Sequence, residues 1–289
     1  AEDDDEWGPP PEGAVKFDVS AAEIEAVLSQ DLGDIAPKED IQVPDALVDD
    51  AHMEKLVTER LPTYVPLADD QTDAFPPPME GEIVQRRLSN GVRMNYKHSE
   101  NEPSGGVLRL VSGGGRSIED PTEPGAGFGS VSVGVRTVSE AGTVGEWERE
   151  QMELFCISKL INCMIDSDEE FVIMDFHFTV KDGGLQGCFQ LLHQFLVAPK
   201  WDPVAFERAK SMYINHYRST EKSLERATAS RIMGAMIQDD RRFRDPTPED
   251  IEALDLEALK KVGSRILTSN TMEVSVVGDV DPQELEACA

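Results

Sequence analysis

Histidine and cysteine are the residues of this 289-residue chain best suited to bind a metal or to act as a nucleophile. A helical zinc site needs two histidines about one turn apart, with a glutamate beside one of them as general base. No H-x-x-E-H pattern occurs, and no histidine has another three to five residues away. The five are His52, His98, His177, His193 and His216. The sequence therefore predicts no catalytic residue and no metal ligand.

The four cysteines, Cys156, Cys163, Cys188 and Cys288, do not have the spacing of a metal site. Residues 147–165 have the apolar pattern of one long amphipathic helix, on which Cys156 and Cys163 would share a face. Thiols in such a position are usually small core residues. This usage suits a reducing compartment.

Four polar residues are candidates for contact with a substrate. Arg136 and Glu140 are one helical turn apart, so a local ion pair competes with contact between Arg136 and a substrate carboxylate. Asp175 and His177 share one face of a predicted strand and could pair, most simply at a surface or an interface. The basic run at residues 241–244 could hold acidic residues of the same protein, or be solvent-exposed.

The charge of the chain is strongly acidic and unevenly distributed. Residues 1–80 contain 22 Asp and Glu against four Lys and Arg, a balance of −18 within the total of −29. The chain has neither the basic footprint of a nucleic-acid-binding protein nor a polybasic membrane patch, and it has no apolar run long enough to span a membrane. An acidic surface favours basic peptides as partners, although it also serves plain solubility.

The elements that would position these residues fall into three parts. Residues 1–35 predict a short strand at 15–19 and a helix that starts at a capping box, Ser20 to Glu23. Residues 36–80 are acidic and proline-rich, typical of an interdomain linker, with one possible helix at 48–61. Residues 81–289 have the pattern of a folded domain.

The main domain begins with a predicted hairpin whose turn is Asn90-Gly91. A strand at 107–111 ends at the glycine triplet 113–115, where a tight turn is favoured over a phosphate cradle because no G-K-[ST] follows. Helices, an alternating strand at 171–180, further helices and a strand at 272–277 follow. This order predicts an α+β fold, with a mostly antiparallel sheet and helices packed on one face.

The sequence resembles one domain of the pitrilysin-type inverzincin metallopeptidases. Within that family it is most similar to the chloroplast members. The resemblance covers most of residues 81–289, and more weakly the strand and helix near 15–35. Several separate stretches carry it in order: V-G-V-R-T-V-S-E at 133–140, E-Q-M-E-L-F-C at 150–156, L-I-N-C at 160–163, F-Q-L-L-H at 189–193, K-S-L-E-R-A-T-A at 222–229 and M-E-V-S-V-V-G-D at 272–279.

The resemblance implies that this chain covers the end of a second domain, a linker and a non-catalytic third domain. The third domain would have the LuxS-like metallohydrolase fold. The family's zinc motif would fall near Val133, Arg136 and Thr137, and its third ligand near Ile214. Valine has no donor atom, and arginine stays protonated and cannot act as a base. Zinc is therefore expected in the full-length enzyme and not on this chain.

The resemblance also implies a function in the chloroplast stroma, where such a zinc endopeptidase removes transit peptides from imported precursor proteins. This chain is then expected to form a wall of the substrate chamber and to bind basic peptide, with Arg136, Glu140, Asp175 and His177 as candidate contacts. Its other partners would be the remaining domains of the same polypeptide. The alternative is a purely structural domain that braces its neighbours and binds no peptide.

Overall fold

The computed structural model describes residues 19–30, 39–60, 64–65, 83–238, 240 and 243–289. The chain divides into two compact units, Ala1–Asp40 and Ile41–Ala289. The strand expected at 15–19 lies, apart from its last residue, outside the described residues. The helix of the first unit, α1 (Ala21–Leu28), starts at the expected capping box, in which Ser20 N donates to Glu23 Oε2 at 2.8 Å.

Part of the expected linker is anchored in the second unit. Leu47 and Val48 are buried, and Leu47 N donates to Gln190 Oε1 at 2.8 Å. The carbonyl of Leu47 accepts from Gln194 Nε2 and from the indole of Trp147. The expected helix follows as α2 (Asp50–Arg60). These contacts attach the stretch around Leu47 to the rest of the second unit.

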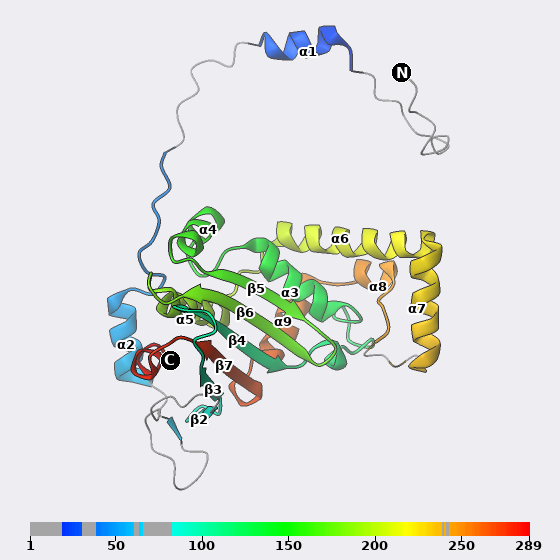
Figure 1. Cartoon of the computed structure of the whole chain (residues 1–289). Helices are drawn as coiled ribbons and strands as arrows, with labels where there is room; N and C mark the ends of the chain where they lie inside the picture. The colour runs from blue at the N-terminus through cyan, green and yellow to red at the C-terminus, as the bar shows by residue number, and fades with distance from the viewer. Residues whose placement is uncertain (1–18, 31–38, 61–63, 66–82, 239, 241–242) are drawn as a thin grey trace. The chain divides into compact units, whose positions relative to one another are not determined.

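One seven-stranded sheet forms the centre of the second unit (Figure 1). The sheet is mostly antiparallel, as the sequence predicted, and β3 (Arg93–His98) and β7 (Met272–Gly278) form a parallel pair within it. The expected turn joins β2 to β3, with Gly91 at φ 96°. In spatial order the strands are β1 (Tyr64–Val65), β2 (Val84–Leu88), β3 (Arg93–His98), β7 (Met272–Gly278), β4 (Gly105–Gly113), β6 (Phe171–Thr179) and β5 (Asn162–Ser167).

Helices cover one face of this sheet, which confirms the α+β prediction. The helices that pack on it are α3 (Ser130–Ala141), α4 (Arg149–Ser158), α5 (Gly184–Val197) and α9 (Leu256–Ile266). The long α6 (Pro203–Lys222) lies along α3 and leads into α7 (Leu224–Met236) and α8 (Pro248–Glu252), and α10 (Pro282–Cys288) packs on α5. The described part of the chain also contains the 3₁₀ turns η1 (Arg116–Ile118) and η2 (Ser269–Thr271).

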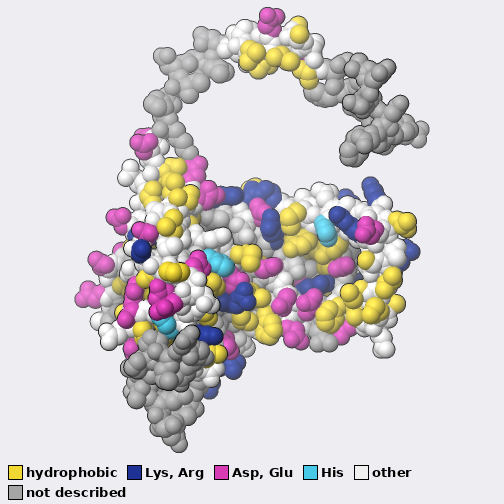
Figure 2. All heavy atoms as spheres, in the orientation of Figure 1, with side chains coloured by type: hydrophobic (Ala, Val, Ile, Leu, Met, Phe, Trp, Pro, Cys, Tyr) yellow, Lys and Arg dark blue, Asp and Glu magenta, His cyan; other side chains and the backbone are white. Residues whose placement is uncertain are grey.

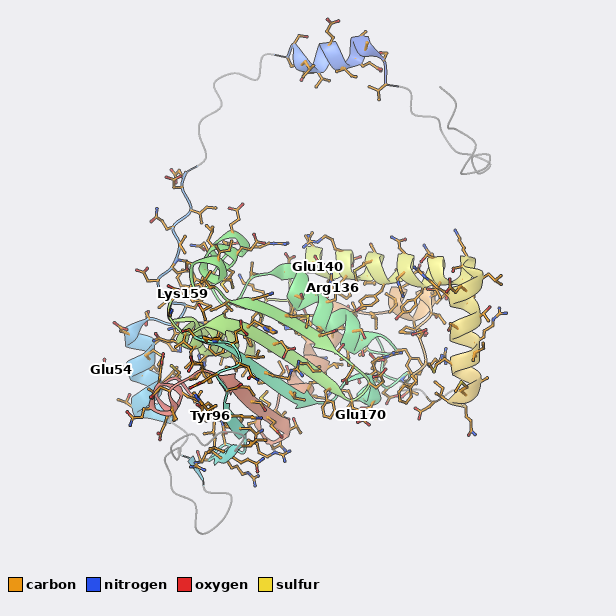
Figure 3. All side chains as sticks on the ribbon, viewed as in Figure 1. Glu54, Tyr96, Arg136, Glu140, Lys159 and Glu170 are labelled. Atoms are coloured by element: carbon orange, nitrogen blue, oxygen red, sulfur yellow. The ribbon has the colours of Figure 1, made fainter. Side chains whose placement is uncertain are left out.

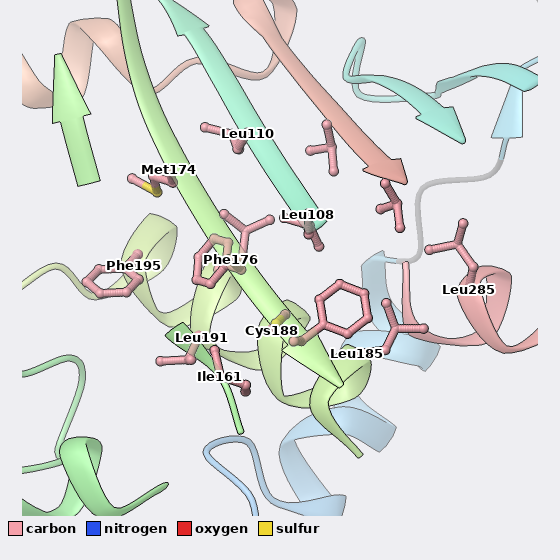
Figure 4. Packing of buried hydrophobic residues seen from close by; sticks show 14 of the residues in the cluster. Leu108, Leu110, Ile161, Met174, Phe176, Leu185, Cys188, Leu191, Phe195 and Leu285 are labelled. Atoms are coloured by element: carbon pink, nitrogen blue, oxygen red, sulfur yellow. The ribbon is translucent and has the colours of Figure 1, made fainter. Parts of the chain in front are cut away.

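The hydrophobic core lies between the sheet and α5 (Figure 4). Phe176 of β6 and Leu108 of β4 are fully buried against Leu185, Cys188 and Leu191 of α5. Alternate residues of β6 point into this core, as its sequence pattern predicted. Burial of each such large side chain stabilises the fold by about 1.5–3 kcal/mol.

The prediction of a single long helix at 147–165 is wrong. The helix α4 ends at Ser158, Leu160 takes a positive φ of 51°, and the chain reverses into the strand β5. A left-handed residue stops a helix, and the apolar residues after it alternate along an edge strand paired with β6. Cys156 and Cys163 therefore lie on different elements.

The glycine triplet forms a turn, as expected. Gly114 has a φ of 126°, and its N–H donates to the carbonyl of Glu170 at 2.8 Å. A Cβ at Gly115 would come within 2.4 Å of the carbonyl oxygen of Asp168. The triplet therefore packs against the β5–β6 turn and needs glycine for that close approach.

Candidate functional site

Helix α3 holds the positions at which the family resemblance would put a zinc motif. The helix begins after Gly129, whose φ is 84°, and ends at Gly142, whose φ is 62°. Its first amides are capped by Glu119, a buried residue whose carboxylate accepts from Gly129 N and Val131 N at 2.9 Å each. Burial raises the pKa of Glu119, and these two hydrogen bonds act in the opposite direction.

At the first and last of the three zinc-motif positions, Val133 and Thr137, the side chains are buried in the packing of the domain. Val133 is fully buried against Phe206 and Ala209 of α6. Thr137 is also fully buried, and its hydroxyl donates to the carbonyl of Val133 at 2.7 Å. Ile214, where the third zinc ligand would fall, packs partly buried on the same cluster. Residues of this kind, pressed between two helices, do not fit a zinc ion.

Arg136 and Glu140 form the expected local ion pair on α3, between Arg136 Nη2 and Glu140 Oε1, and both side chains are partly buried (Figure 3). Nearby on α6, burial raises the pKa of Tyr213, while Arg136 lowers it and Asp166 of β5 raises it. Helix α3 packs against both α6 and β5. Among the described residues, no cluster of three or more His, Cys, Asp or Glu is arranged to hold a metal ion.

Asp175 has a different partner from the one considered from the sequence. Its carboxylate forms a bidentate pair with Arg109 of β4, at 2.6 Å to Nε and 2.7 Å to Nη2. Arg109 and Asp175 are directly opposed in the β4–β6 register, which sequence spacing alone could not reveal. Asp175 is only 4% exposed, whereas His177 is exposed on the same strand.

These two residues lie next to β5, at the edge of the sheet. His177 is opposed to Asn162, and Asp175 is opposed to Met164, which is 56% exposed. Among the described strands β5 pairs only with β6, so its outer backbone edge has no strand partner. The strand leads directly into the acidic turn D-S-D-E-E at 166–170. Sequence reasoning missed this edge because it assigned residues 162–165 to a helix.

The other residues singled out in the sequence are structural in this fold. Burial raises the pKa of Cys156 to about 11 and of Cys163 to about 12, so these thiols are poor nucleophiles. Tyr213 and Tyr217 of α6 stack with ring centroids 6.2 Å apart, and His216 meets the ring of Tyr217 edge-on. Among the described helices, none is long and apolar enough to cross a membrane.

Comparison with known proteins gives the relationship of the chain. Over 277 residues, 96% of its length, it is 43% identical to the chloroplastic stromal processing peptidase of Arabidopsis thaliana. The chain is homologous to part of the stromal processing peptidases. The chloroplastic enzymes of Oryza sativa subsp. indica and Pisum sativum are 42% and 40% identical over the same length. The chain spans 22% of the length of each of these relatives. No protein-family model matches it.

Solved structures show the same fold at low identity. A peptidase M16 inactive domain from Pseudomonas fluorescens superposes with a TM-score of 0.61 at 12% identity, over 72% of this chain and 49% of that one. The ferredoxin protease FusC, in complex with Arabidopsis ferredoxin, gives 0.61 at 15% identity over 94% of this chain and 28% of that one. The chain therefore has the fold of an M16 peptidase domain.

Proposed function

We propose that this chain is a non-catalytic domain of a zinc metalloendopeptidase that removes transit peptides from precursor proteins in the chloroplast stroma. The 43% identity to a stromal processing peptidase over 96% of the chain carries this proposal. The packing of Val133 and Thr137 in α3 supports a role other than catalysis. Zinc and the cleaving residues would then belong to another domain of the same polypeptide.

The role of the domain in this proposal is to form a wall of the substrate chamber and hold basic peptide along β5. An extended peptide can add to a free sheet edge through main-chain hydrogen bonds, and neighbouring side chains then select its composition. The turn at 166–170 supplies acidic charge at the end of this edge. Transit peptides are rich in Arg and Ser and poor in acidic residues, which suits that charge.

The four candidate contact residues flank this edge on two sides. Arg136 and Glu140 lie on α3, which packs against β5, and His177 and Asp175 lie on the neighbouring β6. Because Arg109 neutralises Asp175 and Arg136 is paired with Glu140, direct attraction of a basic peptide would come mainly from the turn. The paired residues would instead shape the two sides of the path.

The proposal is tested by charge reversal beside β5. We expect the chain to bind a fluorescent transit peptide and the variant Asp166→Lys with Glu169→Lys to weaken binding about tenfold, which corresponds to about 1.4 kcal/mol. The control, Glu54→Lys with Glu207→Lys, makes the same change of net charge at exposed sites on α2 and α6. Equal weakening by both pairs would contradict a specific edge site. Absence of binding by the native chain would favour the bracing role.

A further inference from the structure

We propose that the outer face of α7 is a docking surface for an acidic amphipathic helix that belongs to the same polypeptide but lies outside this chain. This inference rests on the proposed function, in which the chain is one domain of a longer protease. It concerns a different surface from β5.

Helix α7 is exposed along its whole length. It turns away from the end of α6 at Ser223, whose hydroxyl accepts from Arg226 N at 3.4 Å (Figure 1). None of its 13 residues is buried. An isolated helix of this length is only marginally stable in water, so most helices of this size depend on packing. Among the described elements, α6 makes the main contact with α7, and one such contact gives α7 little support.

An apolar stripe follows the outer side of α7. Ala229, Ile232, Met233 and Met236 have the spacing i, i+3, i+4 and i+7, which places them on one face. Ile232 is 56% exposed, Met233 54% and Met236 75%, and hydrophobic side chains gather over α7 in Figure 2. The partly buried Ala227, Gly234 and Ile237 lie on the other side of the helix. A contiguous exposed apolar face of this kind marks an interaction site, and methionines let it adapt to a partner helix.

Charge selects the kind of partner. Helix α7 carries Arg226 and Arg231 against Glu225, a balance of +1 in a chain whose total is −29. Arg226 lies three residues before Ala229, at the border of the stripe, and is exposed. This basic balance disfavours a basic transit peptide as the partner. An acidic helix with an aliphatic stripe complements both the charge and the apolar face.

The length of the relatives supports a source within the same polypeptide. This chain spans 22% of the stromal processing peptidase of Arabidopsis thaliana, so most of that protein lies outside the aligned part. A helix on a linked domain meets α7 at a high effective concentration, and a weak contact is then sufficient to hold it. The surface would thus fix one domain against another rather than recruit substrate.

The preference of this surface for an acidic partner is tested with two labelled helical peptides of about 18 residues. The peptides share one Leu stripe and carry either Glu or Lys on the polar face. We expect the Glu peptide to bind this chain at least about tenfold more tightly than the Lys peptide, and increasing salt to weaken it. Ile232→Gln with Met236→Gln should abolish binding. Val204→Gln, at a similarly exposed site on α6, should have no effect. Equal binding of both peptides would overturn the proposal.

Whether the partner helix comes from the same polypeptide is tested by hydrogen exchange of residues 224–236. In the longer polypeptide of the proposed function, we expect these amides to exchange more slowly than in this chain alone, and the Gln pair at 232 and 236 to remove the difference. Equal exchange in the two proteins would overturn an intramolecular partner. Transit-peptide binding by the Gln pair should match that of the native chain, which separates failure here from failure of the β5 site. Its loss in that variant would overturn the assignment of α7 to domain docking.

Discussion

At the scale of single residues, three side chains of α3 make packing, hydrogen-bond or ion-pair contacts at the positions where the family resemblance would place a zinc motif. Val133 packs against α6, the hydroxyl of Thr137 donates to the helix backbone, and Arg136 pairs with Glu140 one turn along the helix. A helix of the same shape can therefore serve packing instead of metal binding. The residue that fixes the start of this helix is Glu119.

Removing the carboxylate of Glu119 should destabilise the domain. Glu119→Ala leaves the amides of Gly129 and Val131 without their acceptor in a buried position. We expect a loss of about 1–3 kcal/mol in the free energy of unfolding, measured by urea denaturation. Glu119→Gln keeps one acceptor oxygen and should lose less. Equal stability of the Ala variant and the native chain would show that this cap does not hold α3.

His193 should make stability depend on pH. Burial lowers its pKa, and the neighbouring His52, whose ring centroid is 5.7 Å away, lowers it further. The unfolded chain therefore binds this proton more readily, so the stabilisation is complete above the unfolded pKa of about 6.5 and is lost as the pH falls below it. We expect Tm to fall between about pH 7.5 and pH 5.5, and His193→Gln to reduce that slope. The exposed His216→Gln should leave the profile unchanged; parallel profiles for all three proteins would contradict this.

At the scale of elements, tertiary pairing decided between helix and strand at residues 162–165. The apolar spacing there fits either period over so short a stretch, and the reversal at Leu160 is not visible in composition. The result is the edge strand β5, on which the proposed peptide site depends. The packing of α3 on α9 is similarly specific, because Trp201 inserts where both helices carry a glycine, Gly134 and Gly263.

Filling the space at Gly263 should disturb this packing. A Cβ there would lie 2.8 Å from Cζ2 of Trp201, so Gly263→Val must displace the indole. We expect a loss of about 2 kcal/mol relative to Ser264→Val, which places the same residue at the adjacent, exposed helical position. Urea unfolding measures the difference, and the fluorescence maximum of Trp201 should shift to longer wavelength. Equal stability of the two Val variants would mean that the indole has room to move.

At the scale of the whole molecule, the charge of −29 has two opposite consequences. Self-repulsion opposes the compact state, whereas acidic surface attracts basic peptide. Salt screens both effects, so it should stabilise the fold while it weakens the proposed substrate contact. This contrast separates electrostatic binding from binding by apolar contact.

Sodium chloride should therefore raise Tm by about 3 °C or more between about 0.05 M and 0.5 M, because the screening length falls to about 4 Å. Differential scanning calorimetry at constant pH measures this directly. Over the same range the affinity for a basic transit peptide should decrease. A Tm that falls with salt would show that attractive surface pairs outweigh repulsion in this chain.

The sequence by itself determined features that depend on residue type and near neighbours. These include the cap at Ser20, the hairpin at Asn90-Gly91 and the lack of an H-x-x-E-H pattern. Only the tertiary structure decided that Arg109 meets Asp175, that Leu47 is buried on α5 and that residues 162–167 form an edge strand. Local geometry specifies the first group because its partners lie within a few residues, whereas strand register and core burial join residues far apart in the chain.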